Sequence, residues 1–177
     1  MATPKAALNR PNPDEYAPYY EKYVSLIPEG DIVATLERQL ETTLSLLRGL
    51  DEAQGLKRYA PDKWSVKEVI GHVIDSERVF AYRALRFARN DQTPLPGYEQ
   101  DDYVRAANFD ERQLGDLADE FEHLRRSNIT LFRSLGEEAW SRSGTANDFA
   151  VTVRALAHII AGHEAHHVGV LQMRYLN

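Results

Sequence analysis

The sequence predicts an all-α protein: a four-helix bundle with a long connection between its second and third helices and an N-terminal extension. Four long segments carry apolar residues at the 3.6-residue period of an amphipathic helix, and no segment shows the sustained alternation of a strand. The length of 177 residues suits one domain with a sizeable core. We therefore assign residues 31–177 to the bundle domain and residues 1–30 to the extension.

The extension is rich in proline and in tyrosine, which includes Tyr16, Tyr19, Tyr20 and Tyr23. So many aromatic side chains are unsuited to a free, solvated tail, because their apolar surface favours burial. We expect this segment to pack on the bundle.

The first two helices have clear start signals. The first is predicted from Asp31, an N-cap residue, to about Leu50. The second opens at Ser65, because Ser65 and Glu68 have the spacing of a capping box, and it continues to about Asn90. Both segments carry an apolar stripe along one face, as the helices of a bundle do.

A long connection follows the second helix, because Pro94, Pro96 and Gly97 do not continue a helix. A short helical turn is expected near residues 102–107. The sequence leaves open whether the connection, residues 91–109, covers a site or is a plain surface loop.

The third helix is predicted from about Asp110 to Gly136, and the fourth from Thr152, an N-cap candidate, almost to the C-terminus. Between them, residues 141–150 are polar and rich in turn-forming residues, so no regular element is expected there.

Composition excludes several classes of function. The absence of cysteine excludes disulfides, thiolate metal sites and a cysteine nucleophile. A net charge of −6 without a basic stripe argues against a nucleic-acid partner. No run approaches 18 apolar residues, and residues 1–9 lack the apolar core of a signal peptide. We expect a cytoplasmic protein without a membrane partner.

Two histidines on the fourth helix indicate a metal site. His163 and His167 lie one turn apart on its core stripe, a spacing that lets two imidazoles bind one ion. The periodicity of the second helix places His72 at the edge of its apolar face, so a third ligand and a surface histidine are equally open there. His123 and His158 are expected to point away from the core, and His166 to lie on a flank of its helix. These three are therefore weaker candidates for metal ligands.

Residues 163–167 also match the H-E-x-x-H motif of zinc peptidases. The extended form of that motif needs glycine and a third histidine where this chain has Val170 and Met173. Only ten residues follow His167, so a third ligand has to come from upstream. We therefore disfavour a peptidase.

Two buried acids are predicted as well. Glu164 and Glu77 face the inner stripes of their helices, where an unpaired carboxylate is costly. Glu164 is a candidate catalytic base or a partner of a ligand histidine, and the alternative is an ion pair with an arginine such as Arg83 or Arg174. Both readings stay open for Glu164, and the ion pair is favoured for Glu77.

The outer side of the fourth helix lacks charge and is built from small residues and one histidine: Ala155, His158, Gly162, Ala165 and Gly169. A helix that faces solvent normally displays charged side chains there. We expect another surface to cover this side, and the sequence leaves open whether it is a second subunit or the tyrosine-rich extension.

Two segments resemble the DinB-like (DinB/YfiT-like) family. Residues 63–77 look like its W-S-x-x-E-x-x-x-H-x-x-D-x-E stretch, and residues 158–171 look like its closing H-x-x-x-x-H-E-x-H-H-x-x-Q-L helix. Val170 stands where many members carry glutamine. The resemblance covers the chain from about residue 30 to its end.

The resemblance implies a four-helix bundle, often a homodimer, with one divalent metal ion per chain, zinc or nickel, held by His72, His163 and His167. It also implies a small-molecule substrate, because characterised members include transferases and isomerases that use the low-molecular-weight thiols bacillithiol or mycothiol. We expect a metal-dependent enzyme of the thiol-dependent transferase or hydrolase type. The alternative is a metal-binding, stress-related bundle without catalysis.

Overall fold

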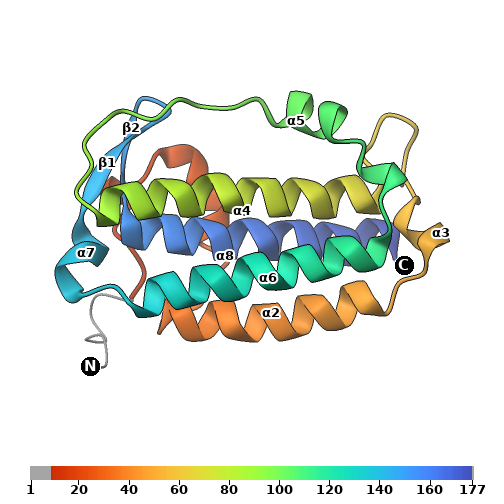
Figure 1. The fold of residues 1–177 in the computed structure, drawn as a ribbon, viewed down its shortest axis with the longest axis horizontal. Helices are drawn as coiled ribbons and strands as arrows, with labels where there is room; N and C mark the ends of the chain where they lie inside the picture. Colours follow the sequence, from red (N-terminus) through yellow and green to blue (C-terminus); the bar gives the residue numbers. More distant parts are fainter. Residues whose placement is uncertain (1–8, 177) are drawn as a thin grey trace.

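The computed structural model describes residues 9–176 and contains the expected bundle (Figure 1). Its long helices form a ring in which α2 packs on α6 and α8, and α4 packs on the same two helices. The apolar stripes of all four therefore meet in one core. These helices are α2 (Ile32–Arg48), α4 (Val66–Ala88), α6 (Leu114–Arg133) and α8 (Val153–Val170).

Shorter elements connect the long helices and extend the last one. They are the single turns Pro13–Glu15, Pro18–Tyr20 and Phe109–Glu111, the helices α1 (Glu21–Val24), α3 (Glu52–Gly55), α5 (Gln100–Ala107) and α7 (Glu137–Ser141), and a π-helical turn at Leu171–Tyr175. The expected turn near residues 102–107 is thus a two-turn helix, α5.

The three N-caps predicted from the sequence are present. The Asp31 carboxylate accepts hydrogen bonds from the backbone N–H groups of residues 33 and 34, and the Thr152 hydroxyl accepts one from residue 155. At the start of α4, Ser65 Oγ accepts from Glu68 N at 3.0 Å, while Ser65 N donates to Glu68 Oε2 at 2.7 Å. This pairing closes the capping box and fixes where α4 begins.

The third long helix begins later than predicted, at Leu114 and not at Asp110. Asn108 has a left-handed backbone with φ of 51°, and a separate single turn follows it. The Asp110 side chain accepts hydrogen bonds from Arg58 and Ser65, so it ties this turn to the start of α4.

Residues 141–150 are more regular than predicted. Strands β1 (Ser143–Ala146) and β2 (Phe149–Thr152) pair antiparallel, with Ala146 opposite Phe149. The two loop residues, Asn147 and Asp148, have φ of 50° and 65°, which is the backbone of a type I′ hairpin turn. Four-residue strands are too short for alternation to reveal them, so only the Asn-Asp pair could have indicated the hairpin.

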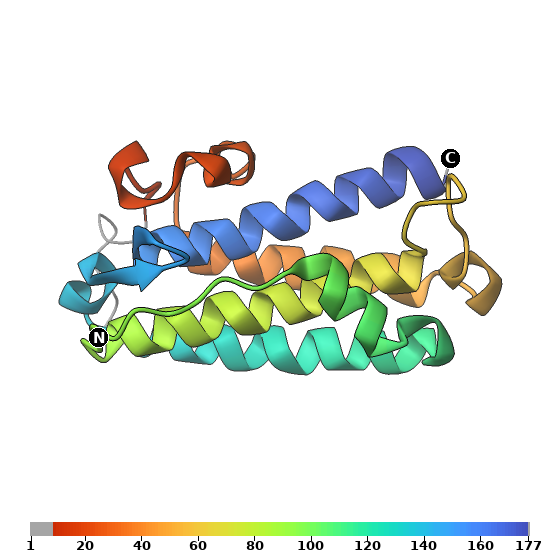
Figure 2. The same ribbon diagram turned by 90° about the horizontal axis from the view of Figure 1, so that it is seen from above.

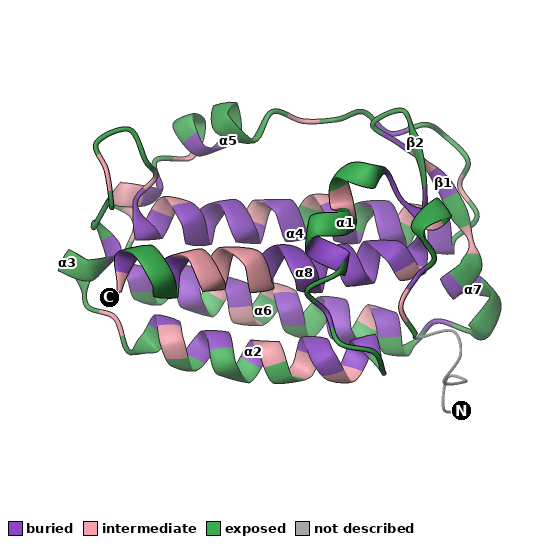
Figure 3. Ribbon diagram, turned by 180° about the vertical axis from the view of Figure 1, so that it is seen from behind, coloured by how far each residue is buried: buried purple, intermediate pink, exposed green. Residues whose placement is uncertain are grey.

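The N-terminal segment lies on α8, and Figure 2 shows it on the side of α8 that faces away from α6. It covers the uncharged outer side of α8, where Ala155, His158 and Gly162 are buried and Ala165 is partly buried (Figure 3). The extension is therefore the surface that covers this side at residues 155–162. A homodimer, implied by the resemblance, stays a prediction. Residues 1–8 lie outside the described residues.

A glycine makes this close approach possible. A Cβ atom on Gly162 would lie 2.1 Å from the backbone oxygen of Tyr23 in α1, well inside van der Waals contact. Gly162→Ala is therefore expected to push α1 away from α8 and to lower the free energy of unfolding by about 1–3 kcal/mol, as overpacking does. Chemical denaturation measures this change.

Gly169→Ala is the matched control on the same helix, because nothing lies within 4 Å of the Cβ that it would add. This variant is expected to be as stable as the wild type or more stable by up to about 1 kcal/mol, since alanine is the better helix former. Equal effects of the two substitutions would contradict the close contact at Gly162.

In the part of the chain that the structure describes, no helix has the length and hydrophobicity needed to cross a lipid bilayer.

Candidate metal centre

Two helices bring the three predicted histidines together. His72 comes from α4, and His163 and His167 come from successive turns of α8, the helix that packs along α4. One ring nitrogen from each lies within 4.8 Å of the others, and Nε2 of His72 is 3.0 Å from Nε2 of His163. His72 is 3% exposed, so the side chain at the edge of the apolar stripe faces inward.

The donor set fits a divalent ion. Two nitrogens bound to one tetrahedral zinc ion, each at 2.0–2.1 Å, are about 3.4 Å apart. The observed nitrogens lie near this separation, with one pair at 3.0 Å and all three within 4.8 Å of one another. Burial lowers the pKa of His72 to about 4 and that of His167 to about 3, and burial with the neighbouring histidines places the pKa of His163 well below its usual value. All three imidazoles are therefore neutral at pH 7, the form that binds a metal.

Aromatic rings pack against the histidine cluster. The ring centroid of Trp64 lies 4.9 Å from that of His72, and the rings of Tyr23 and Phe80 lie 5.2 and 5.9 Å from that of His163. Apolar side chains lower the dielectric beside the histidines, which strengthens charge interactions there.

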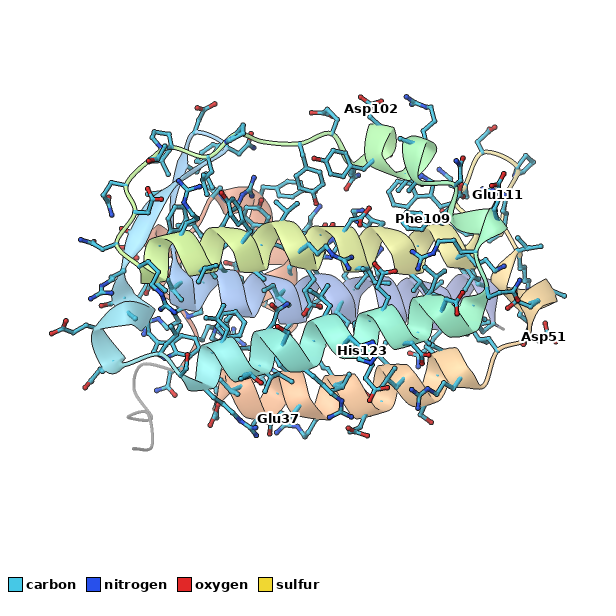
Figure 4. All side chains as sticks on the ribbon, viewed as in Figure 1. Glu37, Asp51, Asp102, Phe109, Glu111 and His123 are labelled. Carbon is cyan, nitrogen blue, oxygen red and sulfur yellow. The ribbon has the colours of Figure 1, made fainter. Side chains whose placement is uncertain are left out.

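A glycine beside the first histidine shapes the same region. A Cβ on Gly71 would lie 2.4 Å from the ring of Phe109, which packs against α4 from the end of the 91–109 connection (Figure 4). The absence of a side chain at Gly71 therefore lets the end of the connection approach the helix that carries His72.

The connection also reaches His72 through a side chain. Nδ1 of His72 lies 3.4 Å from Oγ of Ser76, and this hydroxyl lies 2.7 Å from the hydroxyl of Tyr98. A ligand histidine normally uses its second ring nitrogen in such a contact, which fixes the orientation of the ring. The connection therefore lies beside the histidine cluster, and its role in covering a functional site stays a prediction.

Two sizeable cavities formed by residues 9–176 adjoin the histidine cluster. The larger has a volume of about 570 Å³ and reaches His163, and the smaller has a volume of about 430 Å³ and reaches His167. Asp101, in the first turn of α5, lines both, and its charge acts to raise the pKa of His72. Sequence reasoning missed Asp101, because a residue in a short helix after a proline-rich connection carries no periodic signal.

The two buried acids share a partner that sequence reasoning also missed. Arg125 of α6 is fully buried, and its Nε and Nη2 atoms each lie 2.8 Å from an oxygen of Glu77. Its Nη1 atom lies 2.7 Å from Oε2 of Glu164, whose other oxygen accepts a 2.6 Å hydrogen bond from Thr43. The ion pair favoured for Glu77 is confirmed.

The partners suggested for these acids were wrong. Arg83 and Arg174 lie on the same helices as the acids, whereas the observed partner, Arg125, comes from a third helix. Helix periodicity places residues on a face of one helix, but it does not show which residues of two helices lie at the same height. The catalytic role considered for Glu164 stays a prediction.

The other histidines lie outside the cluster. His123 is exposed on α6, as predicted (Figure 4). His158 points away from the bundle core but is buried, with Nδ1 3.0 Å from the backbone oxygen of Arg154, and burial lowers its pKa to about 4. His166 is partly buried, and its ring contacts those of Tyr23 and His167.

The fold is similar to two solved structures. One, from Bacillus subtilis, is YfiT, described as a probable metal-dependent hydrolase with an unusual four-helix bundle topology; the TM-score is 0.66 at 14% identity, over 92% of this chain and 89% of that one. The other is a mycothiol-dependent maleylpyruvate isomerase, with a TM-score of 0.65 at 16% identity. The match covers 77% of this chain but only 58% of the isomerase.

The sequence comparisons point to one family. No curated protein sequence matches the chain. The sequence model of the DinB superfamily, in contrast, matches residues 35–171, a range that spans the four long helices almost completely and includes all three clustered histidines. This chain belongs to the DinB superfamily.

Proposed function

We propose that this protein is a metal-dependent enzyme that acts on a small molecule, as a thiol-dependent transferase or a hydrolase. One observation carries the proposal: three neutral imidazoles converge at a point that two cavities reach from the His163 and His167 sides. Three protein ligands leave positions free for a reactant, which is typical of catalytic metal sites. Imidazole ligands suit zinc and nickel among the divalent ions.

His72, His163 and His167 would hold a divalent ion, which would act as a Lewis acid and lower the pKa of a water molecule or a thiol toward 7. Residues of this chain orient the ligands and take up the proton. Ser76 and Tyr98 orient the His72 ring, and the Trp64 ring provides an apolar wall beside it.

Asp101 is placed to take up a proton. It lines both cavities, and it is exposed, so a proton received from a thiol or a water molecule passes on to solvent. In the transferase reaction a bond forms between the thiol sulfur and an electrophilic carbon, while the leaving group departs with its bonding electrons. Two cavities at one cluster provide space for two reactants, which favours the transferase.

The zinc-loaded and nickel-loaded proteins should conjugate monochlorobimane to bacillithiol or mycothiol faster than the uncatalysed reaction, as measured by fluorescence. The hydrolase form of the proposal predicts instead thiol-independent cleavage of 4-nitrophenyl acetate. Either activity should be lost in His167→Ala and kept in His123→Ala, which alters an exposed histidine outside the cluster. Tight metal binding without either activity would favour the non-catalytic metal-binding bundle.

A further inference from the structure

The larger cavity contains a buried positive charge that the proposed chemistry does not use. Arg83 of α4 lines this cavity and is only 4% exposed. Its Nη2 atom donates a 2.8 Å hydrogen bond to the backbone oxygen of Pro96, and its charge acts to lower the pKa values of Tyr20 and Tyr98, both of which burial raises. A guanidinium has five N–H donors, so the contacts with Pro96 and with the Tyr20 hydroxyl leave donors for a ligand.

Arg83 differs from the other buried cations of residues 9–176. Arg125 pairs with Glu77 and Glu164, and Lys67 pairs with Glu52 at 2.6 Å, whereas no carboxylate of the described residues forms an ion pair with Arg83. A buried charge without an opposite charge is costly, so a ligand that supplies the opposite charge would be stabilised there.

The position of Arg83 relates it to the histidine cluster. It lies eleven residues after His72, three helical turns along α4 and on nearly the same face. Phe80 lies between the two sites: its ring centroid is 6.0 Å from the guanidinium carbon of Arg83 and 5.9 Å from the ring of His163. A small molecule lying on Phe80 therefore reaches both.

We propose that Arg83 binds the carboxylate of a small organic acid whose apolar body lies on Phe80 and whose reactive end points to the histidine cluster. The guanidinium fork matches a carboxylate in two-point geometry. Tyr19, Tyr20, Tyr23 and Tyr98 supply the flat walls that an aromatic or unsaturated body needs. Glu99 and Asp101 line the same cavity and are exposed, so they disfavour ligands with several negative charges.

The substrate class rests on the proposed function, but the binding site does not, so binding is tested apart from catalysis. Titration of the metal-free His167→Ala protein with 3-phenylpropionate, followed by NMR, avoids direct binding of the acid to a metal. The acid should bind at least about tenfold more tightly than its neutral isostere 3-phenylpropionamide, and it should shift the resonances of Phe80 and Tyr20. Equal affinities of acid and amide would overturn the proposal without any variant of Arg83.

Arg83→Gln, in the same His167→Ala background, should weaken binding of the acid at least about tenfold and leave that of the amide unchanged. Arg78→Gln is the matched control, because Arg78 lies on the same helix, 46% exposed, and pairs with Glu120 outside the cavity. If Arg83 only fastens the connection through Pro96, the Gln variant will melt at a lower temperature and bind the acid normally, which would also overturn the proposal.

The two proposals can fail separately. Binding that depends on Arg83 in a protein without enzyme activity would support the carboxylate site and refute the proposed function alone.

Discussion

His72→Ala, His163→Ala and His167→Ala are each expected to weaken metal binding by more than about 100-fold, since even residues that only orient a ligand contribute 10–100-fold. Each substitution removes one of three nitrogens that lie within 4.8 Å of one another. His72→Ala also removes the only ligand from α4, so the remaining pair lies on one helix. Competition with a chromogenic chelator measures the affinity, and elemental analysis of the purified wild type should give about one ion per chain.

His123→Ala is the control for this series. His123 is exposed on α6 and does not belong to the cluster, so its replacement should leave metal affinity at the wild-type value. The bundle should remain folded in all four variants, because its apolar stripes run along the full helices. Wild-type affinity in His72→Ala would show that the three-histidine site is wrong.

Arg125→Ala is expected to lower the free energy of unfolding by about 3–5 kcal/mol, the usual cost of removing one partner from a buried ion pair. Arg125 joins Glu77 of α4 to Glu164 of α8, and Asn128 donates a further 3.0 Å hydrogen bond to Glu77. Without the guanidinium, two carboxylates remain in the core with no cation beside them. Urea denaturation followed by circular dichroism measures the loss.

The neighbouring Arg126→Ala is the matched control. Arg126 is on the same helix, but its side chain is 55% exposed and its ion pairs with Glu122 and Glu41 lie at the surface. Exposed pairs contribute little, so this variant should unfold close to the wild type. Combining Arg125→Met with Glu77→Gln and Glu164→Gln should recover much of the lost stability, because no buried charge is then left unpaired. Equal losses in Arg125→Ala and Arg126→Ala would contradict the buried network.

Local signals were sufficient for most of the fold. The 3.6-residue period indicated the four helices, and the side chains of Asp31, Ser65 and Thr152 fixed three of their starts, because an N-cap acts on backbone groups two or three residues away. The start of α6 and the hairpin at residues 143–152 were not predicted. The start of α6 depends on contacts of Asp110 with distant residues, and the hairpin has strands of only four residues.

The sequence by itself determined which helices form and that His163 and His167 share one face of the last helix, because these properties depend only on spacing along the chain. The inward position of His72, the pairing of Glu77 and Glu164 with Arg125, and the cover that the N-terminal segment provides were decided by the tertiary structure. Each of these depends on how far one helix is shifted and rotated against another. Periodicity within a single helix carries no information about that shift. A polar residue at the edge of an apolar stripe faces the core or the solvent, depending on which residues of the neighbouring helices lie opposite it.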